Sequence, residues 1–123
     1  MRSRLDSRQP AAFHYELSKR LAPLREAGVL VLGSGNIVHN LRLADFGLDE
    51  GYDWAVRFDA EARARIEAGD HGALVDYPGR GTGDARLAIP TPEHYLPLLY
   101  TLALLAPGDE VQLFNDRCVL GSI

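Results

Sequence analysis

A short apolar run that ends in two glycines sets the strongest limit on the fold. Residues 29–32 read Val-Leu-Val-Leu, and Gly33, Ser34, Gly35 and Asn36 follow directly. A continuous, half β-branched run of this length is typical of a strand covered on both faces, as in a parallel or mixed sheet. The glycines then allow the chain to turn at the carboxyl end of that strand.

Helical patterns surround this run. Phe13, Leu17 and Leu21 recur every four positions and predict a helix whose apolar face is buried. A second amphipathic helix is predicted over residues 52–68. A third is predicted over residues 91–105, because it opens with Thr-Pro-Glu, a helix-start signature, and is apolar nearly all round.

The rest of the chain completes the expected architecture. Residues 78–84 are rich in glycine and proline and predict a loop, and residues 111–114 and 118–120 predict a hairpin. No internal repeat or low-complexity linker divides the sequence. The predicted fold class is α/β, one domain over residues 1–123 with a three-layer mixed sheet flanked by helices.

Charge and cysteine content exclude several classes of partner. Seventeen acids against 13 lysines and arginines give a net charge of −4, which disfavours binding to nucleic acid or to an anionic membrane. Cys118 is the only cysteine, which rules out an internal disulfide and a thiolate metal cluster. No stretch approaches the ~18 apolar residues of a membrane span, and no signal peptide is recognisable. We expect a cytoplasmic protein with neither a nucleic-acid nor a membrane partner.

The glycine loop has three interpretations. A dinucleotide-binding loop needs a third small residue three positions after Gly35, where this chain has Val38, and it needs an acidic residue at the end of a following strand, which is also lacking. A plain turn would use Asn36 and Asn40 to bind loop backbone. A ligand site beyond the end of the strand would place His39 at the rim of a crevice.

A second histidine favours the ligand site without deciding it. His94 lies on the apolar stripe of the helix predicted over residues 91–105, so its ring needs a buried partner, either a backbone carbonyl or a metal. His39 and His94 alone are too few, because zinc takes three or four protein ligands. His14 and His71 could contribute, although the local pattern of each favours a structural or surface role.

Four stretches of the chain together resemble a known family. Residues 7–14 (SRQPAAFH), 33–42 (GSGNIVHNLR), 90–100 (PTPEHYLPLLY) and 120–123 (LGSI) are similar to the DODA-type branch of the class III extradiol ring-cleavage dioxygenases, in the LigB-like superfamily. The resemblance covers nearly the whole chain. Members of the family are about twice as long, so the chain resembles the C-terminal half of the catalytic domain and implies an incomplete LigB-like fold.

The resemblance implies the opening of a catechol-type ring with O₂ at a non-haem Fe(II) or Zn(II). It implies that His94 is a metal ligand and that His39 is a ligand or an acid/base catalyst, with Asn36 and His14 as candidates for substrate binding. The family's other metal histidines come from the N-terminal half, so we expect this chain alone to be inactive and to form a homo-oligomer or pair with that half. The alternative is a non-catalytic oligomerising or ligand-binding domain that retains the fold.

Overall fold

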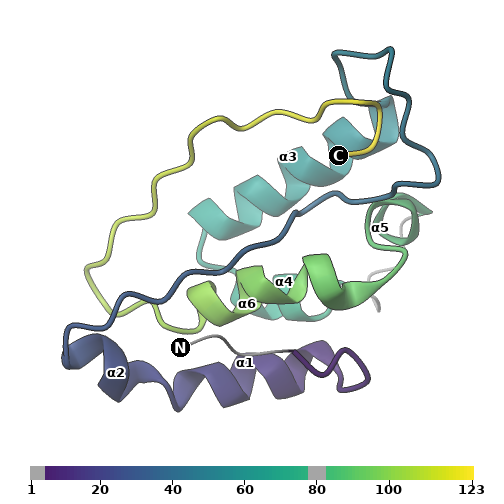
Figure 1. The fold of residues 1–123 in the computed structure, drawn as a ribbon. Coiled ribbons are helices and arrows are strands. Elements are labelled where there is room, and N and C mark those ends of the chain that lie inside the picture. Colours follow the sequence, from purple (N-terminus) through teal and green to yellow (C-terminus); the bar gives the residue numbers. More distant parts are fainter. Residues whose placement is uncertain (1–4, 78–82) are drawn as a thin grey trace.

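The computed structural model describes residues 5–77 and 83–123, and helices supply the regular secondary structure of these ranges (Figure 1). The elements are α1 (Ala11–Lys19), α2 (Ala22–Glu26), α3 (Asp53–Glu67), α4 (His71–Val75), α5 (Gly83–Ala88), the 3₁₀ turn η1 (Pro92–His94) and α6 (Leu96–Leu102). Within the described ranges, none of these helices has the length and apolar character needed to cross a membrane.

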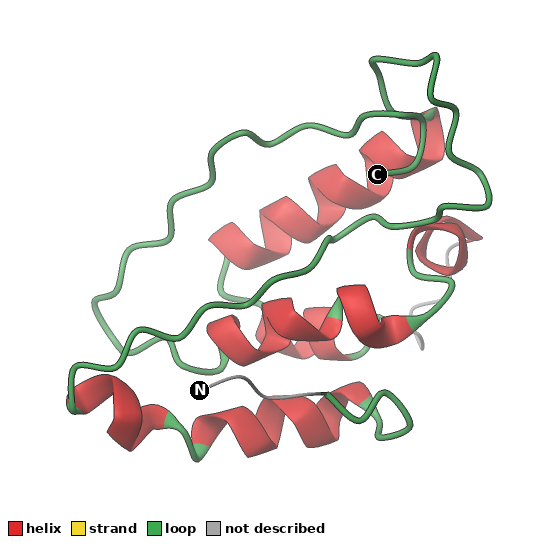
Figure 2. Ribbon diagram, viewed as in Figure 1, coloured by secondary structure: helices red, strands yellow, loops and turns green. Residues whose placement is uncertain are grey.

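The predicted α/β fold with a mixed three-layer sheet is wrong, because residues 5–77 and 83–123 contain no strand. Residues 29–35 run as an extended loop and residues 110–118 as a loop that bends at Asn115, where φ is 53°, so neither the predicted strand nor the predicted hairpin forms (Figure 2). The described residues hold one isolated bridge, which is parallel and joins Gly51 to Gly121. An apolar pattern favours an extended backbone, but a sheet also needs neighbouring strands to pair with, and the described residues place none beside these segments.

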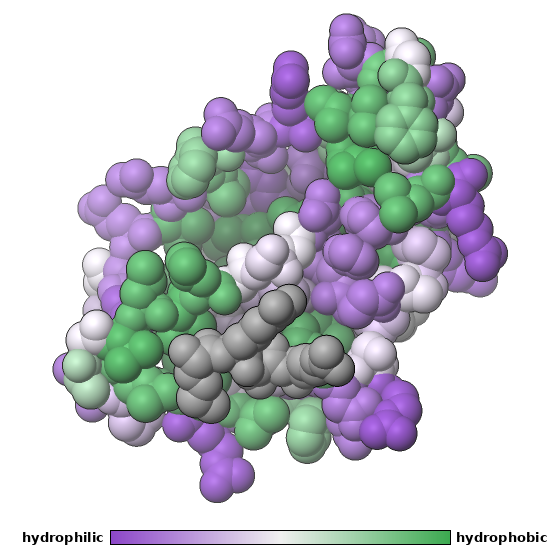
Figure 3. Space-filling view, in the orientation of Figure 1, coloured by the Kyte–Doolittle hydropathy of each residue, from purple (hydrophilic) through white to green (hydrophobic). Residues whose placement is uncertain are grey.

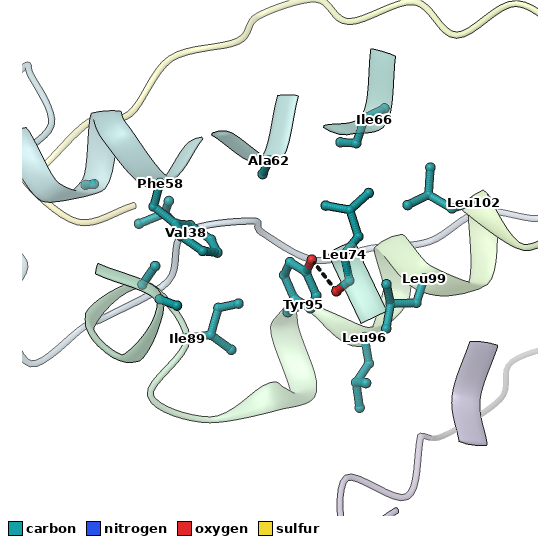
Figure 4. Close-up of a cluster of buried hydrophobic side chains, with 13 residues drawn as sticks. Val38, Phe58, Ala62, Ile66, Leu74, Ile89, Tyr95, Leu96, Leu99 and Leu102 are labelled. Atoms are coloured by element: carbon teal, nitrogen blue, oxygen red, sulfur yellow. Dashed lines mark hydrogen bonds between the residues drawn. The ribbon is translucent and has the colours of Figure 1, made fainter. Parts of the chain in front are cut away.

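Two of the predicted helices form and build the core. Apart from Pro97, the buried side chains of α3 and of α6 recur every three or four residues, which places each set on one helical face. They are Ala55, Phe58, Ala62 and Ile66 on α3, with Leu96, Leu99 and Leu102 on α6. Tyr95 joins them, and its hydroxyl donates a hydrogen bond to the Leu74 carbonyl at 2.9 Å (Figure 4).

The boundaries differ from the prediction where proline intervenes. The helix predicted over residues 91–105 is divided into η1 and a shorter α6, because Pro97 has no N–H to continue the hydrogen-bond ladder from η1. The loop predicted over residues 78–84 lies mostly outside the described residues, and its last two residues, Gly83 and Asp84, begin α5.

The first helix buries a different face from the predicted one. Phe13 and Leu17 are 46% and 38% exposed, whereas His14 and Ser18 are buried. The Ser18 hydroxyl donates to the Tyr100 carbonyl at 2.7 Å, and a ring nitrogen of His14 lies 3.1 Å from the Tyr100 hydroxyl. The partners offered by α6 are therefore polar, and they select the polar face of α1.

Candidate functional site

The glycine loop lies directly against the start of α6. A Cβ atom on Gly35 would stand 2.1 Å from the His94 carbonyl oxygen, and one on Gly33 would stand 2.7 Å from the Pro97 carbonyl oxygen. The backbone N–H of Asn36 donates to the same His94 carbonyl at 2.8 Å. The glycines thus serve a close approach to the chain's own backbone, which occupies the space that a phosphate cradle would need.

This packing brings His39 and His94 together. Their imidazole rings stack with centroids 3.7 Å apart and planes inclined by 22°. His94 ends η1, and His39 follows the glycine loop, where its backbone N–H donates to the carbonyl of Ala88 at 2.9 Å. Both residues are half-buried, so each ring has a protected side and an accessible side. The two histidines singled out in the sequence are therefore neighbours in the fold.

The surroundings of His39 favour its neutral form. Burial lowers the pKa of the His39 imidazole, and the neighbouring His94 lowers it further, while the Glu93 carboxylate acts in the opposite direction. A neutral imidazole keeps a lone pair on one ring nitrogen. At neutral pH His39 can therefore offer this lone pair to a metal or to a proton donor.

Glu93 is the charged group beside the histidine pair. The Thr91 hydroxyl donates to a Glu93 carboxylate oxygen at 2.6 Å, and this hydrogen bond lowers the pKa of Glu93. The sequence position of Thr91 predicts a helix cap, but its side chain makes no capping hydrogen bond and binds Glu93 instead. The negative charge of Glu93 opposes, without reversing, the lowering of the His39 pKa.

Asn40 and Ser122 hold the backbone next to His39 in place. The Asn40 side-chain amide donates to the Leu87 carbonyl at 2.7 Å, and its backbone N–H donates to the Ser122 carbonyl at 3.0 Å. The buried Ser122 hydroxyl donates in return to the Asn40 carbonyl at 2.8 Å. His39 is thus fixed between the end of α5 and the C-terminal segment. The plain-turn interpretation gave Asn40 a backbone-binding role of this kind, whereas the sequence assigned none to Ser122.

The other predicted site residues are placed differently. His14 is buried, and its ring nitrogens lie 3.1 Å from the Tyr100 hydroxyl and 3.1 Å from the Asp6 carbonyl oxygen. His71 accepts or donates a hydrogen bond with the Tyr15 hydroxyl at 2.8 Å. Asn36 is exposed, and its backbone hydrogen bond to the His94 carbonyl places it beside the histidine pair. Substrate binding by His14 and Asn36 stays a prediction.

The histidine pair by itself offers too few donors for a metal site. Neutral imidazole suits both Fe(II) and Zn(II), and each metal takes at least three protein ligands in typical sites. In the part of the chain that the structure describes, no group of three or more His, Cys, Asp or Glu side chains could hold a metal ion. The two imidazoles therefore fall short of the ligand set that either metal takes.

Comparison with curated proteins finds relatives that share one printed name. The chain is 42% identical to the 4,5-DOPA dioxygenase extradiol of Escherichia coli K12 over 97% of its own length and 45% of that protein. It is 34% identical to the protein of the same name from Portulaca grandiflora, over 72% of its length and 32% of the relative. The chain thus spans less than half the length of these curated relatives. No protein-family model matches it.

A solved structure shares the fold. The crystal structure of an uncharacterized protein from Escherichia coli K12 superposes with a TM-score of 0.86 at 35% sequence identity. The match covers 97% of this chain and 50% of the other chain. The arrangement of helices and extended segments described above is therefore shared with about half of a longer protein.

Proposed function

The chain belongs to the family of the 4,5-DOPA extradiol dioxygenases, and we propose that it supplies part of a site at which a catechol-type ring is opened with O₂. It would correspond to the C-terminal half of that catalytic domain. The observation that carries the proposal is the stacking of His39 and His94 at 3.7 Å, which gathers two imidazoles at one point of the surface.

In this proposal, His94 and His39 are ligands of a non-haem Fe(II) or Zn(II). Such a metal, when bound, would lower the pKa of a catechol hydroxyl and hold the ring and O₂ side by side. His39 could instead act as the acid/base group, because its lowered pKa leaves a neutral ring nitrogen to take and return the proton of a catechol hydroxyl.

The remaining contacts of His39 are consistent with a preorganised site. Its backbone N–H is held by Ala88, and its neighbour Asn40 is held by Leu87 and Ser122. Rigid support of this kind keeps a reactive imidazole near its working geometry. Asn36 is the nearest predicted substrate contact, since its backbone N–H already binds the His94 carbonyl.

The proposal requires further ligands from outside the described residues. Two imidazoles are present, and the described ranges offer no set of three or more metal-binding side chains. Because the relatives are more than twice as long as the matched region, we propose that the rest of the domain supplies the missing ligands. The 123-residue chain alone should then bind Fe(II) or Zn(II) weakly and open no catechol ring.

A non-catalytic oligomerising domain is the second candidate. Exposed apolar side chains on the extended segments favour it, with Leu30 at 79% and Phe114 at 81% exposed. A metal titration beside light scattering of the purified chain distinguishes the two. A tight homodimer with no metal affinity would support the second candidate over the first.

A chimera tests the enzymatic proposal. The chain replaces the segment of the E. coli relative that it matches, and opening of DOPA by the purified, Fe(II)-loaded protein is followed by absorbance. We expect the chimera to turn over DOPA. The His94→Ala variant should lose at least about a hundredfold in activity, because the loss of a metal ligand costs more than the loss of a group that only hydrogen-bonds to a ligand. His71→Ala is the matched control and should retain activity, since His71 contacts Tyr15 instead. A folded chimera without turnover would contradict the proposal.

A further inference from the structure

A hollow between α3 and the C-terminal segment collects acidic side chains. Its volume is about 820 Å³, and its walls come from α3, from the loop before α3 and from residues 116–118. Figure 3 shows hydrophilic side chains along the upper left edge of the molecule, where Figure 1 places the C-terminal segment beside α3. The acids that line the hollow are Asp49, Glu50, Asp53, Asp59 and Asp116.

Two of these acids, one on α3 and one on the C-terminal segment, contact each other. Burial raises the pKa of the half-buried Asp59 carboxyl, and Asp116 raises it further through its charge and through a hydrogen bond between the two side chains. Two ionised carboxylates have no donor between them, so this hydrogen bond exists only while one of the two groups carries a proton. Asp59 and Asp116 therefore share a proton across the hollow.

The other titratable groups of the hollow neutralise this pair only in part. Arg57 binds a carboxylate of α5, and Arg117 is exposed. Arg63 donates to Asp116 and to a second carboxylate of α3, and it acts on Asp59 through charge alone. Burial and the two acids raise the pKa of the Cys118 thiol to about 11, so this thiol adds no charge at neutral pH.

Asp116 holds a segment that has few other attachments. Within the described residues, the backbone of residues 110–118 makes no hydrogen bond. The chain bends at Asn115, whose φ of 53° lies in the left-handed region that asparagine tolerates, and Asp116 follows this bend. The ion pair of Asp109 fixes the chain before the segment, and Cys118 packs against the core at its end. The large apolar side chains between these ends are exposed: Val111, Leu113 and Phe114.

We propose that Asp59 and Asp116 form a proton-dependent latch, in which one proton shared by the two carboxyl groups holds residues 110–118 against α3 and its loss releases the segment. When both groups ionise, two negative charges face each other in a half-buried hollow and the donor between them is gone. Arg63 offsets one of these charges and leaves the other. The latch goes beyond the proposed function, because it involves neither His39 nor His94.

The latch should be closed in acid and should open as the pH rises. An aspartate of the unfolded chain titrates near about 3.9, whereas Asp59 in the folded chain keeps its proton to higher pH. The shared proton therefore stabilises the fold completely below about pH 4, and this contribution is lost as the pH rises through the titration of Asp59.

Nuclear magnetic resonance of the isotope-labelled 123-residue chain tests the latch without metal or catechol. Carboxyl ¹³C shifts follow the titration of Asp59, and ¹⁵N relaxation gives backbone order parameters for residues 110–118 at each pH. We expect order parameters near about 0.85 in acid and below about 0.6 once Asp59 is ionised, with one midpoint for both changes. A segment whose order stays constant while Asp59 titrates would overturn the proposal.

Two variants separate the proton from the charge. In Asp59→Asn, an amide donor faces Asp116 at every pH, so residues 110–118 should stay ordered where the unmodified chain loosens. In Asp116→Asn, the neighbouring negative charge is removed, so the titration midpoint of Asp59 should fall. Asp53→Asn is the matched control, because Asp53 is an exposed acid of the same helix and hollow, and it should leave the pH dependence of the segment unchanged.

Each variant can contradict the latch by itself. Loosening of the segment in Asp59→Asn at the pH of the unmodified chain would show that the proton on Asp59 does not hold it. An unchanged Asp59 midpoint in Asp116→Asn would show that the two carboxyl groups are not coupled, and this second result decides the question should Asp59→Asn not fold. A change in Asp53→Asn equal to that in Asp59→Asn would assign the effect to the charge of the whole hollow instead of the pair.

Discussion

The rings of His39 and His94 stack face to face, with centroids 3.7 Å apart, although one follows the glycine loop and the other ends a 3₁₀ turn. The contact depends on Gly35, whose missing side chain lets the loop backbone reach the His94 carbonyl. Two imidazoles from separate parts of the chain therefore form one local unit.

Metal binding by this pair is the first prediction. In the chain alone, Zn(II) binding measured by calorimetry should be weak, and His39→Ala and His94→Ala should each reduce it by at least about tenfold. The reason is that a bound ion would lose one of only two imidazole donors. His71→Ala should leave the affinity unchanged, because the His71 ring contacts Tyr15. Unchanged affinity in both site variants would show that the metal binds elsewhere.

Gly35→Ala should destabilise the chain. A Cβ atom at this position would stand 2.1 Å from the His94 carbonyl oxygen, so the loop or η1 must shift. We expect a loss of about 1–3 kcal/mol in the free energy of unfolding, measured with denaturant. Gly83→Ala is the control, since a Cβ there meets no atom within 4 Å. A stable Gly35→Ala variant would mean that the loop does not need its close approach.

The buried contact between Ser122 and Asn40 should matter for stability as well as for the site. Ser122→Ala removes the hydroxyl that donates to the Asn40 carbonyl, and the expected cost is about 1 kcal/mol. Asn40→Ala leaves these backbone groups in place and removes a different bond, the one that the side-chain amide donates to the Leu87 carbonyl, so it should also cost about 1 kcal/mol. Both are measured as shifts in the denaturant midpoint. The exposed residue Ser34 provides the control Ser34→Ala, which should be neutral.

Acid should remove the contribution of the Arg25–Asp109 pair. Hydrogen bonds from Arg25 and from the Ala106 N–H lower the pKa of Asp109 to about 2. In the unfolded chain an aspartate titrates near about 3.9, so the unfolded state binds the proton more readily. The stabilisation is therefore complete above about pH 4 and is lost as the pH falls through about 2.

Comparison with Asp109→Asn checks this pH dependence. The difference in denaturant midpoint between the two proteins should be constant near neutral pH and should shrink below about pH 4. Glu110→Gln, a change at the adjacent exposed residue, is the control and should not reproduce the pattern. A difference that persists unchanged at pH 2 would contradict the role given to the ion pair.

The core helices could be predicted because their signal is local. Apolar residues spaced by three and four along residues 52–68 mark one face of α3, and that face is buried around Phe58 and Ile66. The approach of His39 to His94 was also anticipated, from the resemblance to a family and from the expected position of the glycine loop. Both inferences used information carried within short stretches of sequence.

The errors arose where the outcome depends on partners distant in sequence. Residues 29–32 have the composition of a buried strand, yet a strand needs a neighbour, and the described chain provides none. The apolar pattern of α1 suggested that Phe13 and Leu17 face inward, but polar groups on α6 select His14 and Ser18. No local pattern marks the pairing of Asn40 with Ser122.

The Arg25–Asp109 ion pair and the Asn40–Ser122 hydrogen bonds have a consequence for folding kinetics. They connect residues 82 to 84 positions apart, so each closes a long loop and contributes strongly to contact order. The helices should form earlier during folding. The two long-range contacts should form late and break first on heating. A protein warmed to just below its unfolding transition would then keep most of its helix content while the His39 loop has already come loose.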